Sequence, residues 1–149
     1  MRVAVPLILI CLACSKPSAR EGEHTVKFEQ YYVQGEQLYV QHCSNCHQKS
    51  GTGLGRVYPP VGKSDFIDDH LDEVICLLKY GREGELTVNG TMFNQTMPPT
   101  NLSNLEIAEV ATYLYNNWGR SKGIIEVSTI DTYLQKCDSI VVQPGSGRH

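Results

Sequence analysis

The chain contains the pentapeptide Cys43-Ser44-Asn45-Cys46-His47, which places two thiols three positions apart and an imidazole directly after the second. On one helical turn these three side chains can share a face. The pattern C-x-x-C-H is typical of covalent attachment of a c-type haem, in which both cysteines form thioethers and the histidine binds the iron. This stretch decides the fold, because the rest of the chain then has to enclose the ring.

Three other interpretations of the pentapeptide are weaker. A structural zinc site needs a second pair of ligands at a matching spacing, and the remaining candidates stand singly at Cys76, Cys137 and His70. A thioredoxin-like redox motif needs a strand-helix-strand pattern that the surrounding sequence lacks. A plain disulfide between Cys43 and Cys46 would leave the following histidine without a role. The sequence therefore predicts one covalently attached haem c.

Length and composition allow one small domain. The chain has 149 residues, of which 41% are hydrophobic and 19% charged, enough for a modest core but not for two. The formal net charge is -3, so no nucleic-acid partner is expected.

The N-terminus predicts export. Arg2 precedes an apolar run that is too short to span a bilayer, so residues 1–13 are interpreted as a signal peptide. The following Cys14 ends a stretch that resembles a bacterial lipoprotein signal, which predicts a lipid on Cys14, with ordinary cleavage nearby as the alternative. Residues 14–25 are then a flexible tether. The expected location is the periplasm or the outer face of a membrane, with membrane contact through the lipid.

Residues before and after the pentapeptide form two further patterns at helical spacing. The first reads Tyr32-x-x-Gly35-x-x-Leu38-Tyr39-x-x-His42-Cys43, and the second reads Leu102-Ser103-x-x-Glu106-Ile107-Ala108-x-Val110-x-x-Tyr113-Leu114-x-x-x-Trp118-Gly119. Together with the haem motif they resemble the first and last helices of the small monohaem bacterial cytochromes c. In that family a glycine and an aromatic residue let the first helix cross the last one closely.

The resemblance implies an all-α, cytochrome c-like fold with four to five helices wrapped around one covalently attached haem. Residues 26–122 are expected to form the cytochrome c domain. Helical patterns are expected from Val26 to the haem motif, over 64–80, and from a capping box at Ser103 and Glu106 onward. Residues 48–62 and 83–95 contain many helix breakers and are expected to be loops. Residues 123–149 are expected to be an extension with one short helix.

The same resemblance implies the remaining haem contacts. The carbonyl of Pro59 becomes the acceptor for the second ring nitrogen of His47, the kind of bond that orients a ligating imidazole. Met97, followed by two prolines, becomes the sixth iron ligand through its thioether sulfur. Met92 is the rival, expected to pack against the haem face if Met97 ligates.

Two thiols remain after export and haem attachment, those of Cys76 and Cys137. Because the expected compartment is oxidising, we expect them to form a disulfide that ties the extension to the middle helix.

A six-coordinate iron has no open position for a substrate, so the sequence predicts an electron carrier and not an enzyme. By resemblance, its partners are exported redox proteins such as quinoprotein dehydrogenases, copper nitrite reductases or terminal oxidases. Three alternatives stay open: a haem subunit of a larger dehydrogenase or oxidase, a gas sensor if Met97 does not ligate, and, least favoured with a single C-x-x-C-H, a haem peroxidase.

Overall fold

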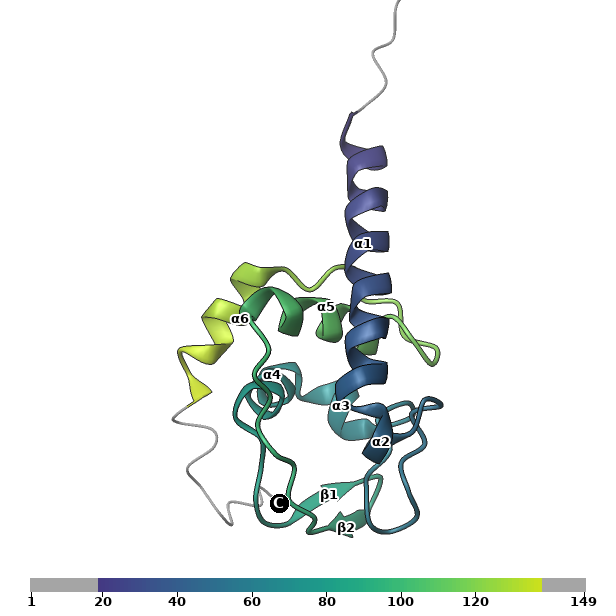
Figure 1. The fold of residues 1–149 in the computed structure, drawn as a ribbon, viewed down its shortest axis with the longest axis vertical. Helices are drawn as coiled ribbons and strands as arrows, with labels where there is room; N and C mark the ends of the chain where they lie inside the picture. The colour runs from purple at the N-terminus through teal and green to yellow at the C-terminus, as the bar shows by residue number, and fades with distance from the viewer. Residues whose placement is uncertain (1–18, 138–149) are drawn as a thin grey trace, which may run out of the picture.

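The computed structural model describes the backbone of residues 19–137 and the side chains of residues 25–137. Six helices and one two-stranded sheet occupy this part of the chain (Figure 1). They are α1 (Ala19–His42), α2 (Ser44–His47), α3 (Asp65–Asp69), α4 (Leu71–Tyr80), β1 (Leu86–Val88), β2 (Thr91–Phe93), α5 (Asn104–Leu114) and α6 (Val127–Leu134). None of the helices within 19–137 is long and apolar enough to cross a membrane. Cys14 and the predicted signal peptide lie outside the described residues.

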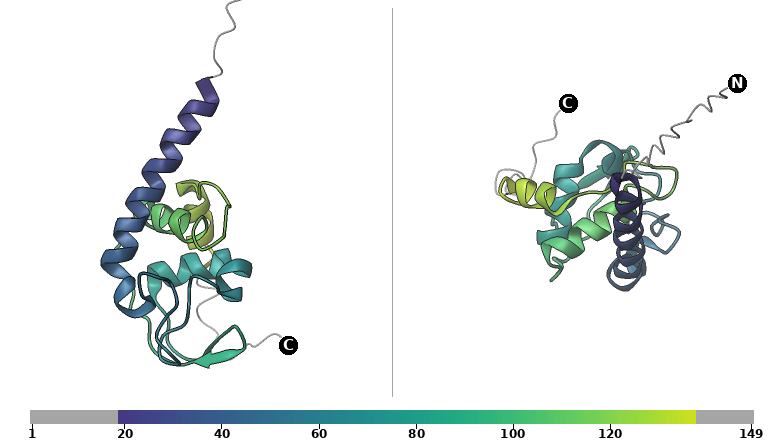
Figure 2. Two further views of the ribbon diagram at one scale, coloured as in Figure 1. Left: turned by 90° about the vertical axis from the view of Figure 1, so that its right-hand side faces the viewer. Right: turned by 90° about the horizontal axis from the view of Figure 1, so that it is seen from above.

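Helices α1 and α5 cross closely, and Gly35 makes this approach possible. A Cβ atom built on Gly35 would lie 2.0 Å from the carbonyl oxygen of Glu109 on α5. Next to this contact the ring of Tyr113 packs against those of Tyr39 and Trp118, with centroids 5.4 and 5.5 Å away. Figure 2 shows α1 as the longest helix, extending well beyond the rest of the domain. Helix α5 packs against the C-terminal half of α1, where Gly35 lies, and α2 follows directly on its end.

The helical character was predicted correctly, but the boundaries differ at two places. Helix α1 begins at Ala19, so residues 19–25, assigned from the sequence to a flexible tether, are helical. This stretch is rich in good helix formers, and extending an existing helix is much easier than starting one. The helix predicted over residues 64–80 is interrupted at His70, which has φ -127° and ψ 56° and separates α3 from α4. The described part therefore has six helices where four to five were expected.

Part of the loop predicted over residues 83–95 is a β-hairpin, so the fold is not entirely helical. Its strands β1 and β2 pair antiparallel, with Val88 opposite Thr91. The turn residues Asn89 and Gly90 both have positive φ, 50° and 70°. Asn-Gly is the preferred pair for such a two-residue turn. The hairpin buries Val88 and Phe93, so it adds a small apolar face to the core.

Helix α5 starts as predicted. The Ser103 hydroxyl accepts from the backbone N–H of Glu106, and the Glu106 carboxylate accepts from the backbone N–H of Ser103, so the capping box is confirmed. Further along the chain, α6 packs against α4 and α5 with Ile130 fully buried. A disulfide joins Cys76 on α4 to Cys137 just after α6, with Cα atoms 5.6 Å apart. The extension is therefore covalently tied to the middle of the domain.

We expect removal of this disulfide to destabilise the domain strongly. The bond closes a loop of 61 residues in sequence, and the chain-entropy model gives about 4 kcal/mol for a loop of that size. The double variant Cys76→Ala/Cys137→Ala, which leaves no unpaired buried thiol, should lose about that much free energy of unfolding in a urea titration. Reducing the wild-type protein should produce a similar loss. A double variant within about 1 kcal/mol of wild type would show that packing alone holds α6.

Candidate haem site

The pentapeptide forms a helical turn that continues almost directly from α1. The backbone N–H of Cys43 donates to the carbonyl of Tyr39 at 2.9 Å, and that of His47 donates to the carbonyl of Cys43 at 3.0 Å. The turn ends at Gln48, whose φ is 63°. Because residues three and four apart share a helix face, Cys43, Cys46 and His47 lie on the same side of this turn.

The two cysteines of the turn are free thiols and partly buried. Burial raises the pKa of the Cys43 thiol to about 11, and the neighbouring Cys46 contributes in the same direction. At neutral pH the Cys43 sulfur is therefore protonated and a poor nucleophile for disulfide exchange. Since Cys76 and Cys137 are bonded to each other, the four cysteines of the described residues divide into a bonded pair and a free pair. Neither bonded cysteine is available as a thiolate ligand for a zinc ion.

The imidazole of His47 is oriented by the loop that follows it. Its Nδ1 lies 2.9 Å from the carbonyl oxygen of Pro59. A carbonyl can only accept, so Nδ1 carries the proton and Nε2 keeps a free lone pair. Burial lowers the pKa of His47, while the bond to Pro59 opposes this effect. The ring is therefore held as a neutral imidazole, the form that binds a metal.

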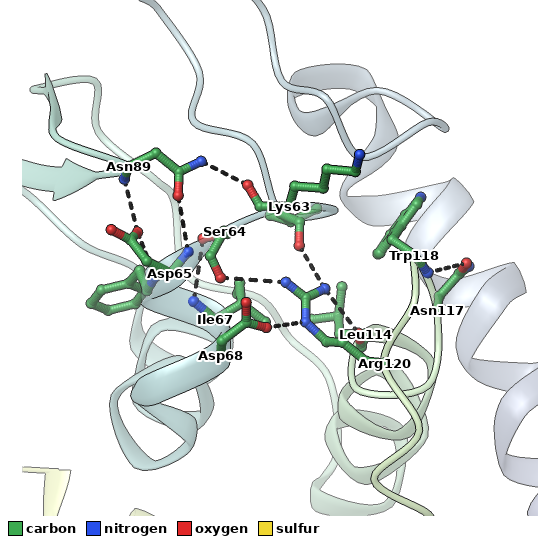
Figure 3. Close-up of polar contacts among 12 residues, drawn as sticks. Lys63, Ser64, Asp65, Ile67, Asp68, Asn89, Leu114, Asn117, Trp118 and Arg120 are labelled. Atoms are coloured by element: carbon green, nitrogen blue, oxygen red, sulfur yellow. Dashed lines mark hydrogen bonds and ion pairs between the residues drawn. The ribbon is translucent and has the colours of Figure 1, made fainter.

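The loop that carries Pro59 is itself fixed by contacts from the segment after α5. A Cβ on Gly51 would lie 2.8 Å from the indole of Trp118, so this turn of the loop packs directly on the ring. The guanidinium of Arg120 donates to the carbonyl of Val61 at 3.0 Å and pairs with the carboxylate of Asp68 (Figure 3). The position of the Pro59 carbonyl thus depends on residues that lie far along the chain.

Met97 lies in the segment between β2 and α5. Its backbone forms an isolated antiparallel bridge with Arg82, through two hydrogen bonds of 2.8 and 2.9 Å. A Cβ on Gly81 would lie 2.4 Å from the carbonyl oxygen of Met97, so the two segments are in close contact. The Met97 side chain is partly buried and packs against the core. In Figure 1 this segment rises on the side of the domain away from α2.

Met92 has a different environment. It lies on β2 opposite Thr87, and both side chains are on the exposed face of the hairpin. The side chain is 60% exposed, while its neighbour Phe93 on the other face is buried. Of the two methionines, Met97 is therefore the one that the fold turns toward the interior. The expectation that Met92 packs against the haem face stays a prediction.

Sequence reasoning missed Arg82 and Arg120. Arg120 anchors the loop that carries Pro59, and Arg82 pairs with Met97. No periodicity or motif marks either residue, because each acts on a segment far away in sequence. His70, which was considered as a ligand, is exposed, with Nδ1 3.4 Å from the carboxylate of Glu73 and its ring stacked on Phe66.

Fold and site together define a cytochrome c domain. Helix α1 leads into the C-x-x-C-H turn, the following loop accepts a hydrogen bond from His47, Met97 is partly buried, and α5 crosses α1 at Gly35. A family model described as cytochrome c oxidase, cbb3-type, subunit III matches residues 32–114, more than half of the chain. The chain belongs to this family.

Curated proteins similar to the chain are also cytochromes. Cytochrome c-552 of Thermus thermophilus is 30% identical over 95 residues, which make up 60% of this chain and 72% of that protein. The chain also matches the protein of the same name from a second strain of that organism, and the match covers 64% of that protein. The cytochrome c subunit of the quinone alcohol dehydrogenase of Gluconobacter oxydans is 28% identical over 101 residues, 64% of this chain but only 21% of that subunit. The similarity to the dehydrogenase subunit therefore concerns about a fifth of its length.

The cofactor is a covalently attached haem c, as in the cytochrome c relatives. The donor set of the structure fits this group. Cys43 and Cys46 are unpaired thiols on one turn, His47 has Nε2 free for iron, and the thioether of Met97 is available on a segment across the domain. Thioether and imidazole are the ligands of electron-transfer cytochromes c.

Proposed function

We propose that this protein is an electron carrier in which haem c is attached at Cys43 and Cys46 and ligated by His47 and Met97. The observation that carries the proposal is the environment of Met97, which is partly buried, packs against the core and is held by a backbone bridge to Arg82. With both axial positions filled, the iron has no site for a substrate, so the protein is not itself an enzyme.

The haem supplies one-electron chemistry, Fe(III) to Fe(II), and a methionine ligand favours the reduced state. The residues of the chain keep the ligands in place in both oxidation states. Pro59 fixes the His47 ring, and Arg82 fixes the backbone of Met97. Rigid ligands mean that little has to rearrange when an electron arrives, which suits fast transfer.

The experiment that tests carrier function is a redox titration of the holoprotein, combined with exposure of its reduced form to carbon monoxide. We expect one haem per chain, a one-electron transition, and no rapid binding of carbon monoxide. An iron that binds the gas readily would instead favour the gas-sensor alternative, because it would show that the sixth position is open.

Candidate partners are quinoprotein dehydrogenases, copper nitrite reductases and terminal oxidases. Similarity to the cytochrome c subunit of an alcohol dehydrogenase supports the first of these, and the description of the matching family names an oxidase subunit. The alternative context is a haem subunit within a larger dehydrogenase or oxidase. Purification from membranes of the native host decides this: a free carrier elutes alone, and a subunit elutes with its complex.

The proposal includes export and a lipid on Cys14, with residues 1–13 removed, residues 26–122 as the haem-binding unit and residues 123–149 as its extension. The sequence around Cys14 supports it. Fractionation of cells that express Cys14→Ser tests it. We expect the variant to leave the membrane fraction, and equal distribution of variant and wild type would contradict lipidation.

A further inference from the structure

The bridge between Arg82 and Met97 fixes the direction of two side chains. Each residue donates its backbone N–H to the carbonyl of the other, at 2.8 and 2.9 Å. In an antiparallel pair of this kind the two residues are directly opposite, about 5.5 Å apart at Cα, and their side chains leave on the same face. The Cβ atoms of Met97 and Arg82 therefore lie on the same side of the bridge.

The guanidinium of Arg82 is only partly satisfied by the protein. One terminal nitrogen, Nη2, donates to the carbonyl of Glu85 at 2.6 Å, which holds the group close to its own segment. The Nε atom is buried and has no acceptor among the described residues. Arg82 also forms none of the ion pairs found among residues 25–137. Arginine cannot lose its proton in a protein, so a permanent positive charge without a carboxylate partner lies on the Met97 side of the bridge.

We infer that Arg82 tunes the reduction potential of the haem: its guanidinium is a fixed cation on the methionine side of the ring and thereby favours the reduced state. The inference rests on the proposed ligation by Met97. Oxidised iron carries one more positive charge than reduced iron, so a nearby cation destabilises the oxidised form. Arg82 is half-buried, so water screens its charge less than that of a fully exposed residue.

The test is the reduction potential of the holoprotein in three variants. Arg82→Gln removes the charge, Arg82→Lys keeps it, and Arg56→Gln removes an equal charge from an exposed position in the loop between α2 and α3. We expect Arg82→Gln to lower the equilibrium constant for reduction by roughly tenfold, about 59 mV for one electron. Arg82→Lys should stay within about threefold of wild type, and Arg56→Gln should change it by less than about twofold, because water screens an exposed charge.

The optical spectrum separates this inference from the proposed function. We expect the weak band at ~695 nm that marks methionine ligation in wild type and in all three variants. Its loss in Arg82→Gln alone would overturn the inference, because the Arg82 side chain would then be needed to hold Met97 in place and would not act through its charge. Equal potentials for Arg82→Gln and Arg56→Gln, or an Arg82→Lys potential as low as that of Arg82→Gln, would also overturn it. A wild-type spectrum without the band would refute Met97 ligation itself and the inference with it.

Discussion

Replacing Met97 by alanine is expected to free the sixth coordination position of the iron and to lower its reduction potential by on the order of 0.1 V. This is a fraction of the ~0.8 V range that axial ligands span in haem proteins. The thioether is the proposed iron ligand on that side of the ring, and a thioether ligand favours the reduced state. Its loss should therefore lower the potential. The reduced variant should bind carbon monoxide readily, and its potential should be measured in the same redox titration as that of wild type.

Met92→Ala is the matched control, because it removes the same side chain from the exposed face of the hairpin. It should leave both the potential and the gas-binding behaviour unchanged. In the reverse result, the reduced Met92→Ala variant would bind carbon monoxide and the reduced Met97→Ala variant would not. That would mean that the hairpin folds back over the haem and that the ligand is misassigned.

Replacing Gly35 by valine is expected to cost roughly 3 kcal/mol or more of stability, at or above the upper end of the range for overpacked cores. Valine would normally be a better helix residue than glycine, so intrinsic propensity predicts a small gain. The structure predicts a loss, because even the first side-chain atom would lie 2.0 Å from the Glu109 carbonyl and 3.0 Å from the Cβ of Tyr113. A backbone carbonyl cannot swing aside, so α1 and α5 must separate.

Gln37→Val is the control for this variant, since Gln37 lies on the same helix and is exposed. Thermal unfolding of the two holoproteins, followed by circular dichroism, gives the comparison. We expect Gln37→Val to unfold within a few degrees of wild type, whereas Gly35→Val should unfold far lower or fail to accumulate. Equal midpoints for the two variants would contradict the close helix crossing.

The sequence was most informative where the chemistry is local. The haem motif, the turn it forms after α1 and the capping box at Ser103 all depend on residues within a few positions of one another. The approach of α1 to α5 was indicated by the resemblance to the bacterial cytochromes, and Gly35 lies at the crossing. The hairpin was missed although Asn89-Gly90 is a strong turn signal, because its strands have only three residues each.

Contacts between distant segments could not be predicted in the same way. Arg120 reaches the carbonyl of Val61, 59 residues earlier, and no local pattern distinguishes it from any other arginine of the chain. The bridge between Arg82 and Met97 pairs two irregular segments, for which side-chain periodicity gives no register. The break at His70 also has no signal in the hydrophobic pattern, since the apolar positions on its two sides continue one helical pattern.

The most direct test of this account is the absorption spectrum of the wild-type holoprotein, recorded from the oxidised to the reduced state in small steps of potential. We predict a weak band at ~695 nm in the oxidised protein, and we predict that it disappears with the same one-electron midpoint as the change in the main haem bands. A spectrum that lacks this band at neutral pH, together with rapid binding of carbon monoxide on reduction, would contradict the assignment of Met97 as ligand and of the protein as an electron carrier.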